Sequence, residues 1–176
     1  GNVTYPDAFT VIGDTLYLTG NDDSDLGLQQ VWAVKGTTLT QISDFQSRTD
    51  PTKLSIVGDN LYFTSKASGE SSLLWKVVGS VATPVATPSA GEAPESPVPG
   101  IAVGNDLYFS AYTPETGTEL WKTDGATTTR LTDINPGRGS SYPGKAFSNE
   151  SKPSGFRLVN QTLFFMADDG QGYKAW

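Results

Sequence analysis

Residues 97–125 read PVPGIAVGNDLYFSAYTPETGTELWKTDG, and they place a proline, an aromatic segment and a tryptophan in a fixed order. The same order occurs three more times, and the Leu of each aromatic segment follows its proline by 10 residues. The prolines are Pro6, Pro51, Pro97 and Pro153, and the tryptophans are Trp32, Trp75, Trp121 and Trp176. A recurrence of about 45 residues indicates a repeat architecture, here with three full copies and one partial copy.

Each copy is expected to form four short strands. The first strand is predicted at residues 8–12, 53–57, 100–103 and 155–159, and a two-residue turn follows it. That turn is Gly-Asp or Gly-Asn in three copies and Asn160-Gln161 in the fourth, which suits a hairpin whose first central residue has a positive φ. The third strand contains the Trp, and a β-branched segment such as 127–134 is predicted as the fourth strand.

The second strand of each copy indicates how the copies pack. Residues 61–63 read LYF and residues 163–166 read LFFM, so apolar side chains do not alternate with polar ones. A strand of this kind is expected to be buried on both faces. In a β-propeller each blade lies between two neighbours, which covers both faces of its middle strands. The tryptophans are then expected to fill the space between blades as core residues.

The sequence therefore predicts an all-β fold, a β-propeller of four-stranded antiparallel blades with three full blades and a partial fourth. Residues 1–176 are expected to form a single propeller or propeller fragment. The predicted blades are roughly 6–50, 51–96, 97–143 and 153–176, and residues 144–152 are a predicted loop insertion. Because the last copy reaches only Trp176, in its third strand, we expect further repeats in a longer chain, or completion by self-assembly.

The motif ELWKTDG at residues 119–125 resembles the bacterial ELWxxDGT repeat family. The segments LTDINPG at 131–137 and LFFMADDG at 163–170 are similar to other parts of that repeat. The other copies depart from it, since they read VWAVKG at 31–36 and LWKVVG at 74–79. The resemblance implies a large, secreted or surface-attached, propeller-like bacterial protein, and it implies shape and location rather than a particular chemistry.

The composition excludes several function classes. The chain has 19 acidic and 12 basic residues, a formal net charge of −7 and a pI of about 4.4, so nucleic acid is not an expected partner. No run of 18 apolar residues occurs, so no membrane span is expected. His and Cys are absent, which removes Ser-His-Asp triads, thiol nucleophiles and the usual zinc ligands. We therefore expect no enzyme activity and no cofactor.

A carboxylate pair of the glycosidase type is the remaining catalytic alternative. In a propeller such a site is expected on the innermost strands, and the predicted first strands contain no Asp or Glu. A glycosidase is therefore the less favoured interpretation.

Calcium is the metal that the sequence could accommodate. Asn21, Asp23 and Asp25 supply oxygen ligands at alternate positions of one loop, as at the start of a calcium-binding loop. Leu26 stands where a Gly is usual, and the bidentate Glu is missing, so a solvated hairpin tip is the alternative.

The sequence thus favours a non-enzymatic module of an extracellular or cell-surface protein, with a role in adhesion, assembly or protein–protein interaction. The alternative is a lectin-like propeller with a glycan partner, for which Tyr112, Tyr142 and Tyr173 are the candidate aromatic side chains.

Overall fold

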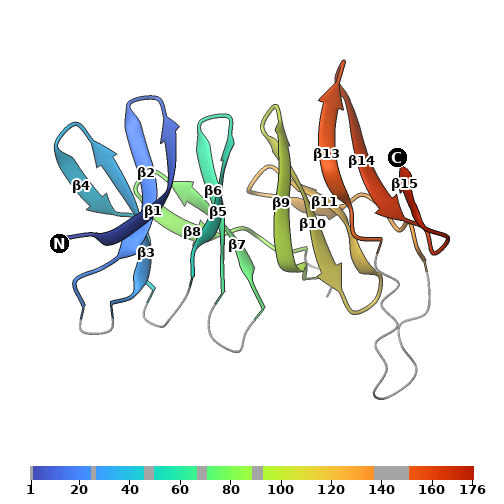
Figure 1. Cartoon of the computed structure of the whole chain (residues 1–176), viewed down its shortest axis with the longest axis horizontal. Coiled ribbons are helices and arrows are strands. Elements are labelled where there is room, and N and C mark those ends of the chain that lie inside the picture. Colours follow the sequence, from blue (N-terminus) through green and yellow to red (C-terminus); the bar gives the residue numbers. More distant parts are fainter. Residues whose placement is uncertain (1, 25–26, 46–49, 67–70, 89–92, 137–150) are drawn as a thin grey trace. The chain divides into compact units, whose positions relative to one another are not determined.

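The computed structural model describes residues 2–24, 27–45, 50–66, 71–88, 93–136 and 151–176. Every regular element in these ranges is a β-strand, and the strands form four antiparallel sheets (Figure 1). Strand order within each sheet follows the order along the chain, so each sheet is a meander. The chain divides into two compact units, Gly1–Val85 and Ala86–Trp176.

The first unit contains two four-stranded sheets. Their strands are β1 (Thr4–Ile12), β2 (Thr15–Asn21), β3 (Gln29–Lys35) and β4 (Thr38–Gln41) in the first sheet, and β5 (Thr52–Val57), β6 (Asn60–Ser65), β7 (Leu73–Val78) and β8 (Val81–Pro84) in the second. Each sheet falls on one copy of the repeat.

The second unit contains a four-stranded sheet and a three-stranded sheet. Their strands are β9 (Glu95–Val103), β10 (Asp106–Thr113), β11 (Gly117–Thr123) and β12 (Thr128–Arg130) in the third sheet, and β13 (Ser154–Val159), β14 (Thr162–Asp168) and β15 (Tyr173–Ala175) in the fourth. Residues 144–150 of the predicted insertion lie outside the described residues.

The turns between the first and second strands have the predicted backbone. Gly13, Gly58 and Gly104 have φ values of 58°, 57° and 59°, and they occupy the first central position of two-residue turns. In the fourth sheet Asn160 and Gln161 both have positive φ, at 47° and 66°. The turn is thus of type II′ where Gly is available and of type I′ where Asn replaces it.

The first strands are longer and less regular than predicted. The structure begins β1 at Thr4 and β9 at Glu95, so Asp7 and Glu95 lie in these strands. The prediction that the first strands carry no carboxylate is therefore wrong. Register shifts interrupt the pairing of each first strand with the second, and Lys53 has a φ of 56° at the shift in β5. Because of these local β-bulges, the segment that contains or adjoins the proline also pairs with the second strand, ahead of the predicted start of the first strand.

The core of the first unit lies between its two sheets. Strand β3 and the exit segment of the first sheet, residues 42–45 after β4, pack against β6 and β7 of the second sheet. Phe63 is fully buried; its ring stacks on Trp75 at 6.2 Å and meets Phe45 edge-on at 6.3 Å. The backbone N–H of Ala82 donates to the carbonyl of Ile42 at 2.9 Å, which ties β8 to the preceding sheet.

One core cluster of the second unit, formed by Leu120, Phe156, Phe165 and Ala167, lies between the third and fourth sheets. Ser151 is fully buried and joins these sheets, because its hydroxyl donates to the Thr118 carbonyl at 2.7 Å and its own carbonyl accepts from Asp168 N at 2.8 Å.

Burial of the second strands was predicted on both faces. In β6 five consecutive residues, Leu61 to Ser65, are buried, as expected. In β14 the pattern alternates, and Phe164 and Met166 are 45% and 39% exposed. The prediction is wrong for β14, because among the described residues no sheet covers that face.

Candidate functional site

The predicted calcium loop connects β2 to β3. Asn21 ends β2 and pairs with Gln29, Asp23 is exposed, and Asp25 lies outside the described residues. Within the described part of the chain, no group of three or more His, Cys, Asp or Glu side chains could hold a metal ion. The calcium ligand set therefore remains a prediction.

Asp22, which the sequence analysis did not single out, organises this loop. Its Oδ1 accepts hydrogen bonds from Ser24 N, from Ser24 Oγ and from Leu28 N, and its Oδ2 accepts from Gln30 Nε2 at 3.2 Å. Burial acts to raise the pKa of Asp22, but the donors on Ser24, Gln30 and Leu28 together lower it. The carboxylate thus serves as a cap for the loop's own donors.

Gln30 is fully buried and fastens the chain where it leaves β4. Its Nε2 donates to the Phe45 carbonyl at 3.0 Å, and its Oε1 accepts from Ser43 Oγ at 2.7 Å and from Phe45 N at 3.0 Å. The Ser43 hydroxyl accepts in turn from Val31 N at 2.8 Å. This polar clamp holds the exit segment against the third strand.

Glu119 forms the same clamp in the third sheet. Its Oε2 accepts from Thr132 Oγ1 at 2.7 Å and from Ile134 N at 3.1 Å, and Leu120 N donates to Thr132 Oγ1 at 3.0 Å. Glu119 is fully buried, and its Oε1 has no hydrogen-bond partner among the residues that the structure describes. The buried carboxylate of Glu119 in the ELW motif is therefore a structural group. Gln30 and Glu119 both stand two residues before a Trp, and this shared position could have suggested the role from the sequence.

The prediction that the tryptophans are core residues is confirmed for Trp32 and Trp121, which are buried, and is wrong for Trp176, which is 45% exposed. Trp121 is fully buried, and its Nε1 donates to the Ala111 carbonyl at 3.2 Å. Trp32 and Trp176 make the same bond to the carbonyls of Gly20 and Ala167, at 3.0 and 3.3 Å. Trp75 is half-buried and stacks on Phe63, and within the described part of the chain its Nε1 has no hydrogen-bond partner.

The tyrosines considered for a lectin-like site do not share one environment. Tyr112 is partly buried in β10, Tyr173 is 53% exposed in β15, and Tyr142 lies outside the described residues. The structure therefore does not bring these three side chains together as a described site.

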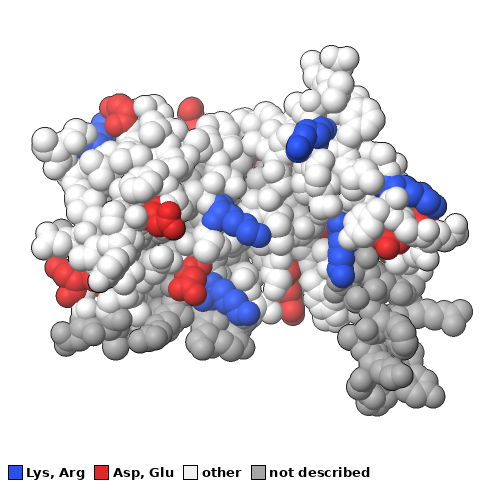
Figure 2. All heavy atoms as spheres, viewed as in Figure 1, with Lys and Arg blue, Asp and Glu red and all other residues white. Residues whose placement is uncertain are grey.

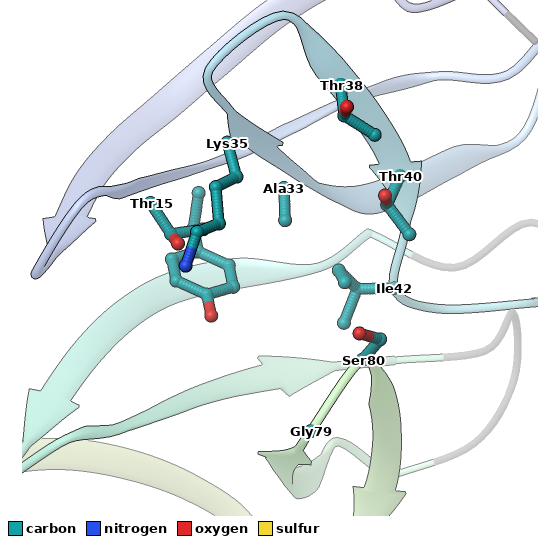
Figure 3. Close-up of a pocket in the computed structure, with 9 residues that line it drawn as sticks. Thr15, Ala33, Lys35, Thr38, Thr40, Ile42, Gly79 and Ser80 are labelled. Carbon is teal, nitrogen blue, oxygen red and sulfur yellow. The ribbon is translucent and has the colours of Figure 1, made fainter.

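A pocket of about 350 Å³ lies in the first unit, between the first sheet and the turn that joins β7 to β8 (Figure 3). Its volume falls in the range of about 300–1,000 Å³ that is typical of small-molecule sites. The lining residues are Thr15, Tyr17, Ala33, Lys35, Thr38, Thr40, Ile42, Gly79 and Ser80. The pocket combines five side-chain hydroxyls, one of them on the Tyr17 ring, and one ammonium group with a methyl group and a branched aliphatic side chain.

The positions of the lining residues follow from the strand register. Tyr17 pairs with Ala33, Ala33 with Thr40, and Lys35 with both Thr15 and Thr38, so these side chains lie on one face of the first sheet. Figure 3 shows Thr38 and Thr40 on one strand and Ser80 on the neighbouring turn. The Ala82–Ile42 backbone bond fixes this turn beside the sheet.

Lys35 supplies the charge of the pocket. Its Nζ lies 3.0 Å from Asp14 Oδ1, and the two side chains are 67% and 72% exposed. The hydrogen bond from Lys35 is the main cause that lowers the pKa of Asp14 below its usual value. Asp14 is thus ionised at neutral pH, and the pair remains open to solvent.

Basic and acidic side chains are interspersed on the face drawn in Figure 2, and uncharged residues make up most of it. None of the described residues belongs to a helix long and apolar enough to cross a bilayer.

The chain was compared with known proteins. No family model and no curated protein matches it. Among solved structures it is similar to the apo form of the AtxE2 isopeptidase, with a TM-score of 0.52 and 12% identity over 90% of this chain and 24% of that chain. It also matches the Bacteroides ovatus xyloglucan PUL protein GH43B, with a TM-score of 0.37 and 13% identity over 97% of this chain and 39% of that chain.

These similarities bear on the fold alone. The first shows that most of this chain shares its β-sheet fold with a segment of the isopeptidase, and the second TM-score is too low to support an argument. The chain spans 24% and 39% of the lengths of these two proteins. Their activities therefore do not transfer to it by similarity.

Proposed function

We propose that the four sheets are blades of a β-propeller and that the chain acts as a non-enzymatic binding module of an extracellular or cell-surface protein. The arrangement within each unit supports a propeller. The first strands of neighbouring sheets, β1 and β5 in one unit and β9 and β13 in the other, lie side by side. In a propeller the first strand of each blade is the innermost, and neighbouring first strands meet around the axis.

The proposed binding role rests on one observation, which is that side chains recurring between copies make contacts inside the scaffold. The indole N–H of Trp32, Trp121 and Trp176 bonds a backbone carbonyl, and the buried clamp of Gln30 and Glu119 recurs in two sheets. What the repeat maintains is therefore a packed scaffold. A scaffold of this kind presents its binding groups at positions that differ between copies, and adhesion or assembly is the role that suits it.

The membership in the ELWxxDGT family and the cell-surface location are parts of the same proposal, and they rest on the motif at residues 119–125. The test is a paired screen of the purified chain. We expect no turnover of chromogenic glycosides or isopeptide-linked peptides, and retention of a ligand from an array of glycans and surface proteins. Turnover that follows the chain through purification would contradict the proposal. A crystal structure in which the sheets do not surround a common axis would contradict the propeller.

A further inference from the structure

The pocket of the first sheet coincides with one residue difference between the copies. Tyr17 pairs with Ala33 across β2 and β3. The corresponding pairs are Tyr62 with Lys76 in the second sheet and Tyr108 with Lys122 in the third. The Tyr thus recurs, but the first copy has a methyl group where the other two have a long basic side chain.

The lysines of the other copies extend from the position that corresponds to Ala33. Lys76 Nζ lies 5.6 Å from the centroid of the Tyr62 ring. Lys122 Nζ donates to Asp106 Oδ2 at 2.9 Å, and the Asp106 position, two residues before the Tyr, is Thr15 in the first copy. The first copy therefore lacks both the covering cation and its carboxylate partner, and a pocket lined by Tyr17 and hydroxyl groups remains.

We propose that this pocket binds one pyranose unit of a glycan, and that Lys35 gives it a preference for a sugar that carries a carboxylate. The inference rests on the proposed binding function and names its ligand class. A pyranose has an apolar C–H face that can lie against the Tyr17 ring and the Ala33 methyl group. Its edge presents hydroxyls that can exchange hydrogen bonds with Thr15, Thr38, Thr40 and Ser80, which all line the pocket.

Lys35 is suited to the recognition of a carboxylate. It is the one charged side chain among the lining residues. Its partner Asp14 lies outside the lining, and both are largely exposed, so their ion pair contributes little and does not withhold the ammonium from a ligand. A ligand carboxylate that replaces Asp14 at Lys35 Nζ would gain a charge-assisted hydrogen bond that a neutral sugar lacks.

The experiment uses the whole chain with methyl β-glucuronide, methyl β-glucoside and inorganic phosphate as probes. Binding is detected by saturation-transfer NMR and quantified by calorimetry. For one small sugar in one open pocket we expect a Kd on the order of 1 mM for the glucuronide, about tenfold tighter than for the glucoside. Phosphate should compete weakly or not at all.

Ala33→Lys tests the origin of the pocket. The substitution installs the side chain that Lys76 and Lys122 have in the other copies, and we expect at least a tenfold loss of glucuronide affinity. The matched control is Val11→Lys, which adds the same charge at a position of β1 that is 57% exposed and does not line the pocket. That control should bind like the parent chain.

Two conservative substitutions keep the test informative if Ala33→Lys disturbs the fold. Thr40→Val removes one hydroxyl at nearly constant volume and should weaken both glycosides severalfold. Lys35→Gln should abolish the preference for the glucuronide while the glucoside affinity is kept.

Several results would overturn the inference. These are the absence of binding by either glycoside, phosphate binding without glycoside binding, or glycoside binding that Ala33→Lys and Thr40→Val leave unchanged. Equal affinities for glucuronide and glucoside would overturn the role of Lys35. If the chain retains other ligands from the array but binds no glycoside, the site assignment fails and the binding function stands. Glycoside turnover would reject the binding function itself.

Discussion

Glu119→Gln should stabilise the second unit, although it removes a hydrogen-bonded carboxylate. Glu119 is fully buried, its Oε2 accepts two hydrogen bonds, and its Oε1 has no partner in the described ranges of the chain. Gln30, at the same place of the first copy, uses its Nε2 as a donor to the Phe45 carbonyl at 3.0 Å. Ile134 is the counterpart of Phe45, because its N–H bonds the clamp side chain in the same way. An amide at position 119 therefore gains a donor that can reach the Ile134 carbonyl.

The magnitude follows from opposing contributions. Relief of a buried unsatisfied acceptor is favourable by about 1–3 kcal/mol, and a new buried hydrogen bond adds about 0.5–1.5 kcal/mol. Against this, the bonds from Thr132 and Ile134 lose their charge assistance, which weakens each by roughly half. Removal of a buried charge lowers the desolvation cost as well. We expect a net gain of about 1–2 kcal/mol in the free energy of unfolding.

The assay is urea unfolding at pH 7, followed by tryptophan fluorescence. With an m value of about 2 kcal/mol/M, a gain of this size raises the midpoint by about 0.5–1 M at unchanged m. The reciprocal control, Gln30→Glu, places a carboxylate oxygen against the Phe45 carbonyl and the Asp22 carboxylate, and it should cost at least about 2 kcal/mol. If Glu119→Gln lowers the midpoint, or if both substitutions shift stability in the same direction, the equivalence of the two clamps is wrong.

Four other predictions concern packing, backbone and loop. Trp121→Phe should cost about 1 kcal/mol more than Trp75→Phe in thermal or urea unfolding, because it also loses the indole bond to Ala111, and equal costs would contradict this role. Lys53→Gly should raise stability by about 0.5–1 kcal/mol, since a glycine removes the strain of a φ of 56°, and a lower melting temperature would argue against strain there. The pKa of Asp22 is lowered in the folded state, so its contribution to the free energy of unfolding should be complete above about pH 4 and lost as the pH falls through the folded pKa. Asp22→Asn should flatten that part of the pH–stability curve. Added calcium should leave the melting temperature unchanged if residues 21–27 form only a hairpin tip, whereas a rise would establish the calcium site.

Sequence patterns predicted the parts of the fold that are set by local chemistry. A Gly before Asp or Asn marks a turn that needs a positive φ, and Gly13, Gly58 and Gly104 have one. The absence of alternation at residues 61–63 predicted burial on both faces, which β6 shows. These features depend on a residue's own conformational preference or on the period of its neighbours, so a single sequence is enough to predict them.

Other features depend on contacts between distant residues, and such contacts leave little sign in a single sequence. Lys53 adopts a positive φ in a bulge, although no Gly or Asn marks the place. Tertiary pairing of the proline segment imposes that conformation. The clamp joins Glu119 to Thr132 and Ile134, which lie far from it in the sequence, so the motif around Glu119 does not reveal these hydrogen bonds. The pocket at Ala33 arises from a side chain that is short, and a missing group leaves no pattern to detect.

The position of the pocket suggests where specificity arises in a repeat protein of this type. A residue that is the same in each copy is constrained by packing, because each sheet must present the same surface to its neighbour. The tryptophan is of this class, because all four copies have it, and we expect substitution there to change stability before it changes recognition. Ala33 is of the other class, since its place in the sheet accepts either a lysine, as in Lys76 and Lys122, or a methyl group. With a lysine the tyrosine face is covered, and with alanine a pocket of about 350 Å³ opens beside Lys35. Ala33 is also buried in the core between the first two sheets, so Ala33→Lys tests whether this one side chain decides between a covered and an open surface.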